Sequence, residues 1–304
     1  MILRRLLPLT AFALALIVSR PLAALTPASW TTPFPPFRIA GNLYYVGSED
    51  LAAYLIVTPK GDILINSNLA SSPPMIKQSV EALGFHLRDI RILLISHGHY
   101  DHCAGSAEIK RLSGAKYYVM AQDVSVVESG GGTDFNYATD KSMRFPATHV
   151  DRSLHDGEKI SLGGAVLAAH LTAGHTKGTT TWTLDENEAG RTLHVVIVGS
   201  PNVNPGYKLV GNKQYPQIAA DYRHQFQVLN SLPCDIFLGA HGGYFGLAEK
   251  YPRFQAGDKN AFIDPEGYKG YIVDRQQAFE TELAKQRKAA QELAHPQAGA
   301  RPAL

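Results

Sequence analysis

The chain has 304 residues, of which 45% are hydrophobic and 18% are charged, a balance typical of a globular protein with ample material for a buried core. Its formal net charge is +2, and loss of Arg4, Arg5 and Arg20 with a leader would lower this charge to −1. Nucleic-acid binding normally requires a strongly basic face, so this balance excludes a nucleic-acid partner.

The first 23 residues have the layout of a secretory signal peptide. Two arginines precede an apolar run at residues 6–18, and small residues follow at Ala23 and Ala24. The alternative is a membrane anchor, but this run would reach only about 20 Å as a helix, against a bilayer core of roughly 30 Å. We therefore expect a bacterial protein that is exported to the periplasm or secreted, with no membrane contact after cleavage.

Strands and helices alternate along the first half of the mature chain. A Pro-rich extended arm at residues 30–37 comes first. Short β-rich runs follow at 43–46, 53–58 and 62–66, and then a helix with apolar residues at helical spacing at 73–83. A continuous apolar run at 92–96 predicts a strand buried on both faces. A helix is expected at 101–112, a strand at 117–120 and a long surface loop near the site at 130–146.

The second half repeats this order. Strands are expected at 159–162, 165–171, 179–184 and 193–198, followed by a polar loop at 201–216 and helices at 218–232 and 273–293. The two halves, roughly 25–150 and 151–295, predict an α/β (α+β) fold of two sheets packed face to face with helices outside. We expect one domain over residues 24–295, because no linker divides them, and a disordered tail at 296–304.

The strongest chemical signal is the segment SHGHYDHCAG at 96–105, which follows the buried strand directly. It places four ligand-type side chains within six residues: His97, His99, Asp101 and His102. Imidazole and carboxylate together suit a borderline cation such as zinc. The alternative is a polar loop that happens to be rich in histidine, which twelve histidines in the whole chain make improbable.

Two single histidines complete a metal-binding set. His175 stands in a Gly-flanked turn between two predicted strands, and His241 ends an apolar run before Gly242. Five histidines and one aspartate supply three ligands for each of two metals and leave open positions for water, as catalytic zinc requires. We therefore expect a hydrolase with two zinc ions as cofactors.

In these motifs the chain resembles the metallo-β-lactamase superfamily, and the resemblance extends from GNLYYVGSED at 41–50 to about Arg253. It implies the αββα four-layer sandwich. The superfamily also contains thioesterases, lactonases and nucleases, so the fold alone does not choose the reaction. Ser200 narrows the choice, because thioesterases and lactonases of the superfamily carry a metal-bridging aspartate in this position. A serine there resembles class B β-lactamases of the third subclass, as do the segments at 30–37, 170–184 and 204–216.

The resemblance also implies the role of each residue. His97, His99 and His175 would bind the first zinc, and Asp101, His102 and His241 the second. A hydroxide between the ions would attack the β-lactam amide of penicillins, cephalosporins and carbapenems, with Asp101 orienting it, which would give antibiotic resistance. Tyr207 is the candidate donor to the oxyanion. Ser200 and Asn202 are candidates to bind the substrate carboxylate, although Asn202 departs from the serine common in the subclass.

Several alternatives remain open. The chain could be another superfamily hydrolase acting on a lactone, thioester or phosphoester, or a non-enzymatic zinc-binding or sensing protein. The expected partner is a small molecule, the β-lactam, and a monomer is favoured. Cys103 and Cys234 are expected to stay unpaired, because a strand from Cys234 toward His241 would separate them by about 20 Å.

Overall fold

The computed structural model describes residues 26–294. The predicted signal peptide and the predicted disordered tail lie outside these residues. Within the described part of the chain, no helix is long and apolar enough to cross a membrane.

Two β-sheets form the centre of the structure; the first takes its strands from the chain up to Leu154, and the second from Lys159 onward. The first sheet runs in chain order: β1 (Phe37–Ala40), β2 (Leu43–Tyr45), β3 (Tyr54–Ile56), β4 (Asp62–Ile65), β5 (Ile90–Leu94), β6 (Lys116–Met120) and β7 (Arg152–Leu154). The second has the order β12 (Ile236–Gly239), β11 (Arg191–Val198), β10 (Thr180–Glu188), β9 (Ala165–Leu171) and β8 (Lys159–Leu162). β4 to β7 pair in parallel, as do β11 and β12, and the other neighbours pair antiparallel.

The strand periodicity explains how the layers are held together. In β4, Ile63 and Ile65 pack in the core between the sheets, together with Leu167 and Trp182 of the second sheet. Leu64 points to the other face and packs in a separate cluster with helices outside the first sheet. Because successive side chains of a strand alternate between faces, one apolar strand supplies both cores.

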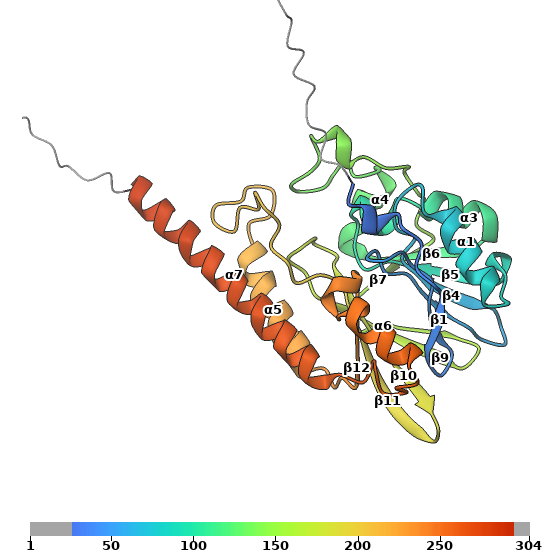
Figure 1. Ribbon diagram of the computed structural model, residues 1–304. Helices are drawn as coiled ribbons and strands as arrows, with labels where there is room; N and C mark the ends of the chain where they lie inside the picture. The colour runs from blue at the N-terminus through green and yellow to red at the C-terminus, as the bar shows by residue number, and fades with distance from the viewer. Residues whose placement is uncertain (1–25, 295–304) are drawn as a thin grey trace, which may run out of the picture.

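Helices cover both outer faces, which gives four layers in the order αββα (Figure 1). The α-helices are α1 (Pro73–Ala82), α2 (Tyr100–Cys103), α3 (Ser106–Ser113), α4 (Val124–Glu128), α5 (Ile218–Ser231), α6 (Leu247–Gln255) and α7 (Pro265–Ala294). Residues of α1 and α3 pack on the first sheet, and residues of α5 and α7 join the core that the two sheets share. The predicted fold class is therefore correct, and the shared core supports the proposal that residues 24–295 form one domain.

The helix expected over 101–112 is wrong in one respect, since it is two helices with a break at Ala104 and Gly105. The His102 carbonyl accepts hydrogen bonds from the backbone N–H groups of Ser67 and Asn68, at 3.0 and 3.2 Å, instead of continuing the helical ladder. A Cβ on Gly105 would lie 2.4 Å from the Ser67 carbonyl oxygen, so the chain passes there only as glycine. This break fixes Asp101 and His102 on a single short turn.

The last helix begins earlier than predicted, at Pro265 instead of Val273. Proline suits a first helical turn because its missing N–H would have no partner there. The short elements β1, β7, α4 and α6 were not predicted at all, since three to nine residues with mixed burial leave no clear periodicity. Both cysteines are free, as expected, and Cys103 is buried with its thiol donating to the His99 carbonyl.

Candidate metal centre

Four of the predicted ligands come from one tight segment after β5. His97 and His99 lie in the loop beyond the strand, His99 with extended backbone, and α2 then carries Asp101 and His102. The buried Asp123 fixes this loop, because its carboxylate accepts from the Gly98 N–H at 2.8 Å. The same carboxylate accepts from Thr176 and Gly178 at 2.7 and 2.8 Å, and so joins the loop of His97 and His99 to the loop of His175.

The other two predicted ligands lie in loops at the ends of strands of the second sheet. His175 lies in the turn between β9 and β10, and His241 follows β12 at the start of the short η5 turn (Gly242–Tyr244). A β-bridge between Leu51 and His241 ties this end of the second sheet to the chain between β2 and β3. The site therefore lies along one shared edge of the two sheets, as predicted.

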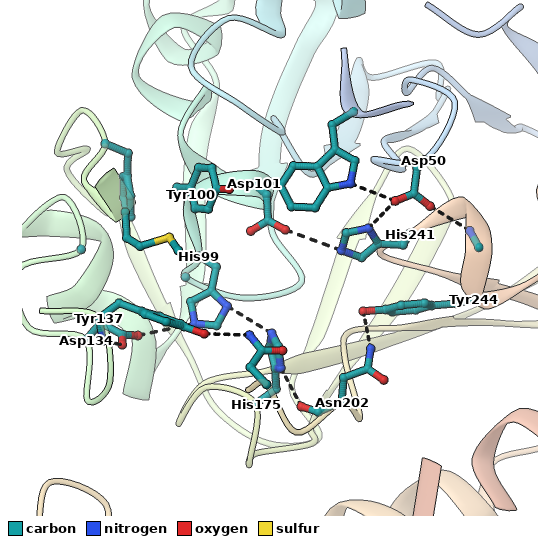
Figure 2. Close-up of a pocket in the computed structure, with 17 residues that line it drawn as sticks. Asp50, His99, Tyr100, Asp101, Asp134, Tyr137, His175, Asn202, His241 and Tyr244 are labelled. Atoms are coloured by element: carbon teal, nitrogen blue, oxygen red, sulfur yellow. Dashed lines mark hydrogen bonds and ion pairs between the residues drawn. The ribbon is translucent and has the colours of Figure 1, made fainter. Parts of the chain in front are cut away.

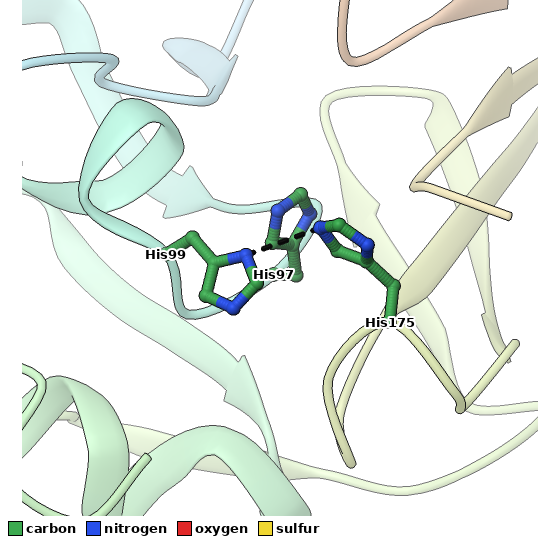
Figure 3. A group of neighbouring side chains, drawn as sticks. All are labelled: His97, His99 and His175. Carbon is green, nitrogen blue, oxygen red and sulfur yellow. Dashed lines mark hydrogen bonds between the residues drawn. The ribbon is translucent and has the colours of Figure 1, made fainter. Parts of the chain in front are cut away.

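The first trio is compact. The possible ligand atoms of His97, His99 and His175 all lie within 4.8 Å of one another, and all three rings are buried (Figure 3). Nδ1 of His99 lies 3.1 Å from Nε2 of His175. Zinc bound to imidazole at about 2.0 Å in tetrahedral geometry holds its ligand atoms roughly 3.3 Å apart, so this spacing fits one ion.

The second trio is arranged around the Asp101 carboxylate. Its Oδ2 lies 3.1 Å from Nε2 of His102 and 3.6 Å from Nε2 of His241. The ligand atoms of Asp101 and His102 also lie within 4.8 Å of His97, so His97 adjoins both groups. All six predicted ligands are thus brought together as two adjacent trios.

Unpaired buried nitrogens show that these groups fit metal ions. Both ring nitrogens of His97 and of His102 are buried and have no hydrogen-bond partner among the described residues. Buried polar atoms in proteins almost always have a partner, so such a concentration at one place needs an explanation. A cation bound by the imidazole lone pair would satisfy one nitrogen of each ring.

Two of the histidines donate to acceptors on the side away from the trio, and a third lies near a carboxylate there. His241 Nδ1 donates to Asp50 at 2.9 Å, and His175 Nδ1 donates to the Asn202 carbonyl at 2.8 Å (Figure 2). His99 Nε2 lies 3.6 Å from the carboxylate of Asp134. An acceptor on one ring nitrogen fixes the tautomer that leaves the other lone pair for a metal, an arrangement found around zinc ligands in general.

Sequence reasoning did not find Asp50 or Asp134. Asp50 lies 191 residues from His241 in the chain, and Asp134 occurs in a segment predicted only to border the site. Neither has a local pattern that would mark it as a partner of a histidine. A search for carboxylates in loops that flank the predicted ligands would have named them as candidates, without assigning either to its ring.

Burial sets the electrostatics of His97 and His175. It lowers the pKa of His97 well below its usual value and lowers the pKa of His175 to about 3. Burial opposes ionisation of Asp101, but the nearby His102 and His241 outweigh it and hold the pKa of that carboxyl well below its usual range. Burial also disfavours the charged forms of His99 and His241, but Asp134 beside His99, and Tyr244, Asp101 and Asp50 beside His241, outweigh it and raise both pKa values. His97 and His175 are therefore the ligands already held in the neutral form that zinc coordination needs, beside an ionised carboxylate.

The cavity beside the two trios has a volume of about 380 Å³. Figure 2 shows His99, Asp101, His175 and His241 around it, with Tyr137 and Tyr244 on its walls. Apolar contact surface comes from Trp30, Tyr100, Tyr137, Met143 and Phe145. No lysine or arginine lines this cavity in the described part of the chain, whereas Asp50, Asp101 and Asp134 do. The cavity therefore accepts a small, partly apolar molecule, and its own side chains supply negative charge.

The structure separates the three predicted substrate-contact residues. Asn202 lines the cavity, but Ser200 and Tyr207 do not. Ser200 is fully buried, with its hydroxyl 3.2 Å from that of Tyr244. The buried Tyr207 hydroxyl donates to the His175 carbonyl at 2.8 Å. The expected contacts of Ser200 and Tyr207 with substrate are thus not supported, because both hydroxyls are already used within the protein; Tyr207 instead supports the His175 turn.

Comparisons with known proteins agree with this geometry. Residues 51–189 match the family model described as the metallo-beta-lactamase superfamily. The native FEZ-1 metallo-β-lactamase from Legionella gormanii is 58% identical, with a TM-score of 0.84 and coverage of 84% of this chain and 98% of that one. BJP-1, a subclass B3 metallo-β-lactamase of Bradyrhizobium japonicum, is 34% identical, with a TM-score of 0.80 and coverage of 86% and 98%. The class B3 di-zinc metallo-β-lactamase LRA-12 from an Alaskan soil metagenome is 37% identical, with a TM-score of 0.81 and coverage of 84% and 97%.

Proposed function

Since the chain belongs to the metallo-β-lactamase superfamily, we propose that it hydrolyses the amide bond of β-lactams with two bound zinc ions. The observation that carries this proposal is the pair of adjacent trios, His97/His99/His175 and Asp101/His102/His241, beside a cavity of drug-like size. Zinc held there would lower the pKa of bound water to about 7 and polarise the substrate carbonyl. In a bacterium such an enzyme confers resistance to these antibiotics.

Asp101 has the position for a catalytic role besides holding metal. Asp101 lies in the first turn of α2 and lines the cavity. Its Oδ2 faces His102 and His241. A carboxylate has two oxygens, so Oδ1 remains free to orient a water molecule in the cavity by accepting a hydrogen bond from it. The hydrogen bond from His241 to Asp50, and the carboxylate of Asp134 3.6 Å from His99, favour one orientation of the rings around it, which keeps that water in a defined place.

Ser200 favours β-lactams over the other substrates of the superfamily. Ser200 lies two residues beyond the end of β11, in the position that a metal-bridging carboxylate would occupy. Its hydroxyl instead contacts the hydroxyl of Tyr244. Without a carboxylate there, the two trios share no bridging protein ligand from this strand. The similarity to β-lactamases over more than four fifths of the chain supports the same choice over a lactone, thioester or phosphoester.

The direct test is an assay of the mature, zinc-loaded protein against penicillins, cephalosporins and carbapenems, with a lactone and a thioester in parallel. We expect hydrolysis of β-lactams only. Turnover of the lactone or thioester alone would support the other hydrolase, and two bound zinc ions without any turnover would support a sensing protein. Either result would contradict the proposal.

The location and assembly of the protein are also proposals. The signal-like leader supports cleavage near residue 23 and a periplasmic or secreted enzyme, and we propose a monomer that needs no protein partner. N-terminal sequencing of the protein recovered from the periplasm would check the cleavage bond.

Asp50 offers a test of the second metal site that does not depend on the substrate. Asparagine at this position keeps the shape but loses the charge that pairs with His241 Nδ1–H. We expect Asp50→Asn to weaken zinc binding at the second site by about 10–100-fold, the usual cost of losing such a partner, and to leave the first site unchanged. Competition with a chelator of known affinity measures both sites.

Glu49→Gln is the matched control, because it removes the same charge from the neighbouring exposed position. It should bind zinc as the wild type does. Equal affinities of Asp50→Asn and wild type at both sites would show that Asp50 does not orient His241.

A further inference from the structure

Arg275 lies on α7, outside the cavity, and reaches its wall from behind. Its NH1 donates to Oδ1 of Asn202 at 3.2 Å, and Asn202 lines the cavity. On the far side, Arg275 borders a groove between α7 and the loop at 201–207. The guanidinium and the cavity are therefore separated by one side chain.

This contact decides which way the Asn202 amide faces. A guanidinium only donates hydrogen bonds, so the amide atom toward Arg275 must be the oxygen. The NH₂ group then faces the cavity side, where it donates to the Tyr244 hydroxyl at 2.8 Å (Figure 2). That hydrogen bond uses one of the two N–H donors of the amide.

Aromatic rings fix the positions of Arg275 and of Tyr244, the two partners of the Asn202 amide. The Arg275 guanidinium lies 5.8 Å from the centre of the Tyr271 ring, which stacks on Tyr244 at 5.3 Å. Tyr244 in turn lies 5.0 Å from the ring of His241. The amide of Asn202 is thus separated from the ring of His241 by Tyr244, and Arg275 is held by contacts of its own.

We propose that Arg275 is a positioning and specificity-determining residue, which directs the Asn202 NH₂ group and positive charge toward the carboxylate of the substrate. This inference rests on the proposed β-lactamase function. In bicyclic β-lactams the carboxylate is carried by the carbon bonded to the ring nitrogen, so it must lie close to that nitrogen. Among protein groups the cavity lining contains carboxylates and no basic side chain in the described residues, so the donor that the protein adds to the charge of the proposed zinc ions has to come from a neutral group such as the Asn202 amide, which Arg275 orients.

The charge of Arg275 is moderated by its neighbour Asp274. Asp274 accepts from the Arg275 Nε at 3.0 Å, and Glu282 borders the same groove. Asp274 is largely exposed, so solvent screens this pair. The hydrogen bond from Arg275 to Asn202 points toward the cavity and is partly buried. It is therefore the contact through which Arg275 acts on the cavity.

The test compares a β-lactam that has its free carboxylate with the methyl ester of the same compound. For Arg275→Gln we expect KM for the free acid to rise about tenfold, the usual order for a charge-assisted hydrogen bond, with kcat changed less than about threefold. KM for the ester and the zinc content should stay at wild-type values. Arg275→Lys keeps the charge but loses the planar fork, so its KM should lie between the two.

Two further variants separate positioning from a structural role. Arg223→Gln breaks an exposed ion pair between α5 and Glu280 of α7, removes the same charge, and should leave KM unchanged. In an Asn202→Ala background, Arg275→Gln should have almost no further effect on KM, because Arg275 acts through Asn202. A KM for the free acid unchanged by Arg275→Gln, or raised equally for acid and ester, would overturn the inference while leaving β-lactam hydrolysis intact. A wild type that hydrolyses neither compound would overturn the proposed function itself.

Discussion

Asp101→Ala should abolish β-lactam hydrolysis and reduce bound zinc from two ions to about one. Asp101 is the anionic member of the second trio, with His102 and His241 at 3.1 and 3.6 Å from its Oδ2. Its removal takes away a metal ligand and the carboxylate proposed to orient water in the same step. We expect kcat/KM to fall by more than about 100-fold, beyond the range seen when only an outer partner of a ligand is lost. Steady-state kinetics and metal analysis of the same preparation measure both effects.

Two variants control this prediction. Asp185→Asn removes a carboxylate from the exposed end of β10, where it pairs with His194, and should leave activity and zinc content unchanged. Asp101→Asn keeps the size and one ligand oxygen but loses the charge, so it should retain more zinc than alanine and still lose most activity. Full activity of Asp101→Ala, or two zinc ions bound with wild-type affinity, would refute both the ligand and the catalytic assignment.

The sequence was sufficient to predict which six residues the fold brings together as two trios, because these residues carry local signals. Four of them fall within six residues after an apolar strand, and His175 and His241 each stand beside glycine at the end of such a strand. Strand ends of two packed sheets meet along one edge, so the chain order already implied that the six would converge. The exposure of each side chain could not be read in the same way. Ser200 and Tyr207 were predicted to face substrate, but their hydroxyls point to Tyr244 and to the His175 carbonyl.

The residues that orient the ligands and the cavity wall could not be predicted from the sequence, for a different reason. Asp50 meets His241 across 191 residues and Arg275 meets Asn202 across 73, and no periodicity relates the members of either pair. Their pairing depends on how the chain between β2 and β3, and the helix α7, pack against the second sheet. The break between α2 and α3 has the same origin, because the N–H groups of Ser67 and Asn68 compete for the His102 carbonyl. Local propensity predicts the elements, whereas these contacts are set by tertiary packing.

Removal of zinc should destabilise the protein as well as inactivate it. The trios bury imidazole nitrogens that have no partner among the described residues, so the metal-free fold leaves them desolvated and unpaired. A ligand at 100 times its dissociation constant adds about 2.7 kcal/mol of stability, and 1 kcal/mol moves the Tm of a chain of this size by roughly 2–4 °C. Each occupied site should therefore raise Tm by about 5–10 °C. Thermal unfolding after chelation and dialysis, with and without added zinc, measures this shift.

His97 allows that shift to be assigned to the trios, because it is the one ligand whose nitrogens adjoin both groups. His97→Ala should lose most of the zinc-dependent rise in Tm. The first trio would then lack a ligand, and the second would lose a buried neighbour of Asp101 and His102. His194→Ala is the matched control: its ring pairs with Asp185 at the surface, so the zinc-dependent rise should equal that of the wild type. If chelation left Tm and β-lactam hydrolysis unchanged, the unpaired histidines would need another explanation and the two-zinc site would be wrong. If zinc raised Tm equally in wild type and His97→Ala, the stabilising ion would have to bind outside the trios.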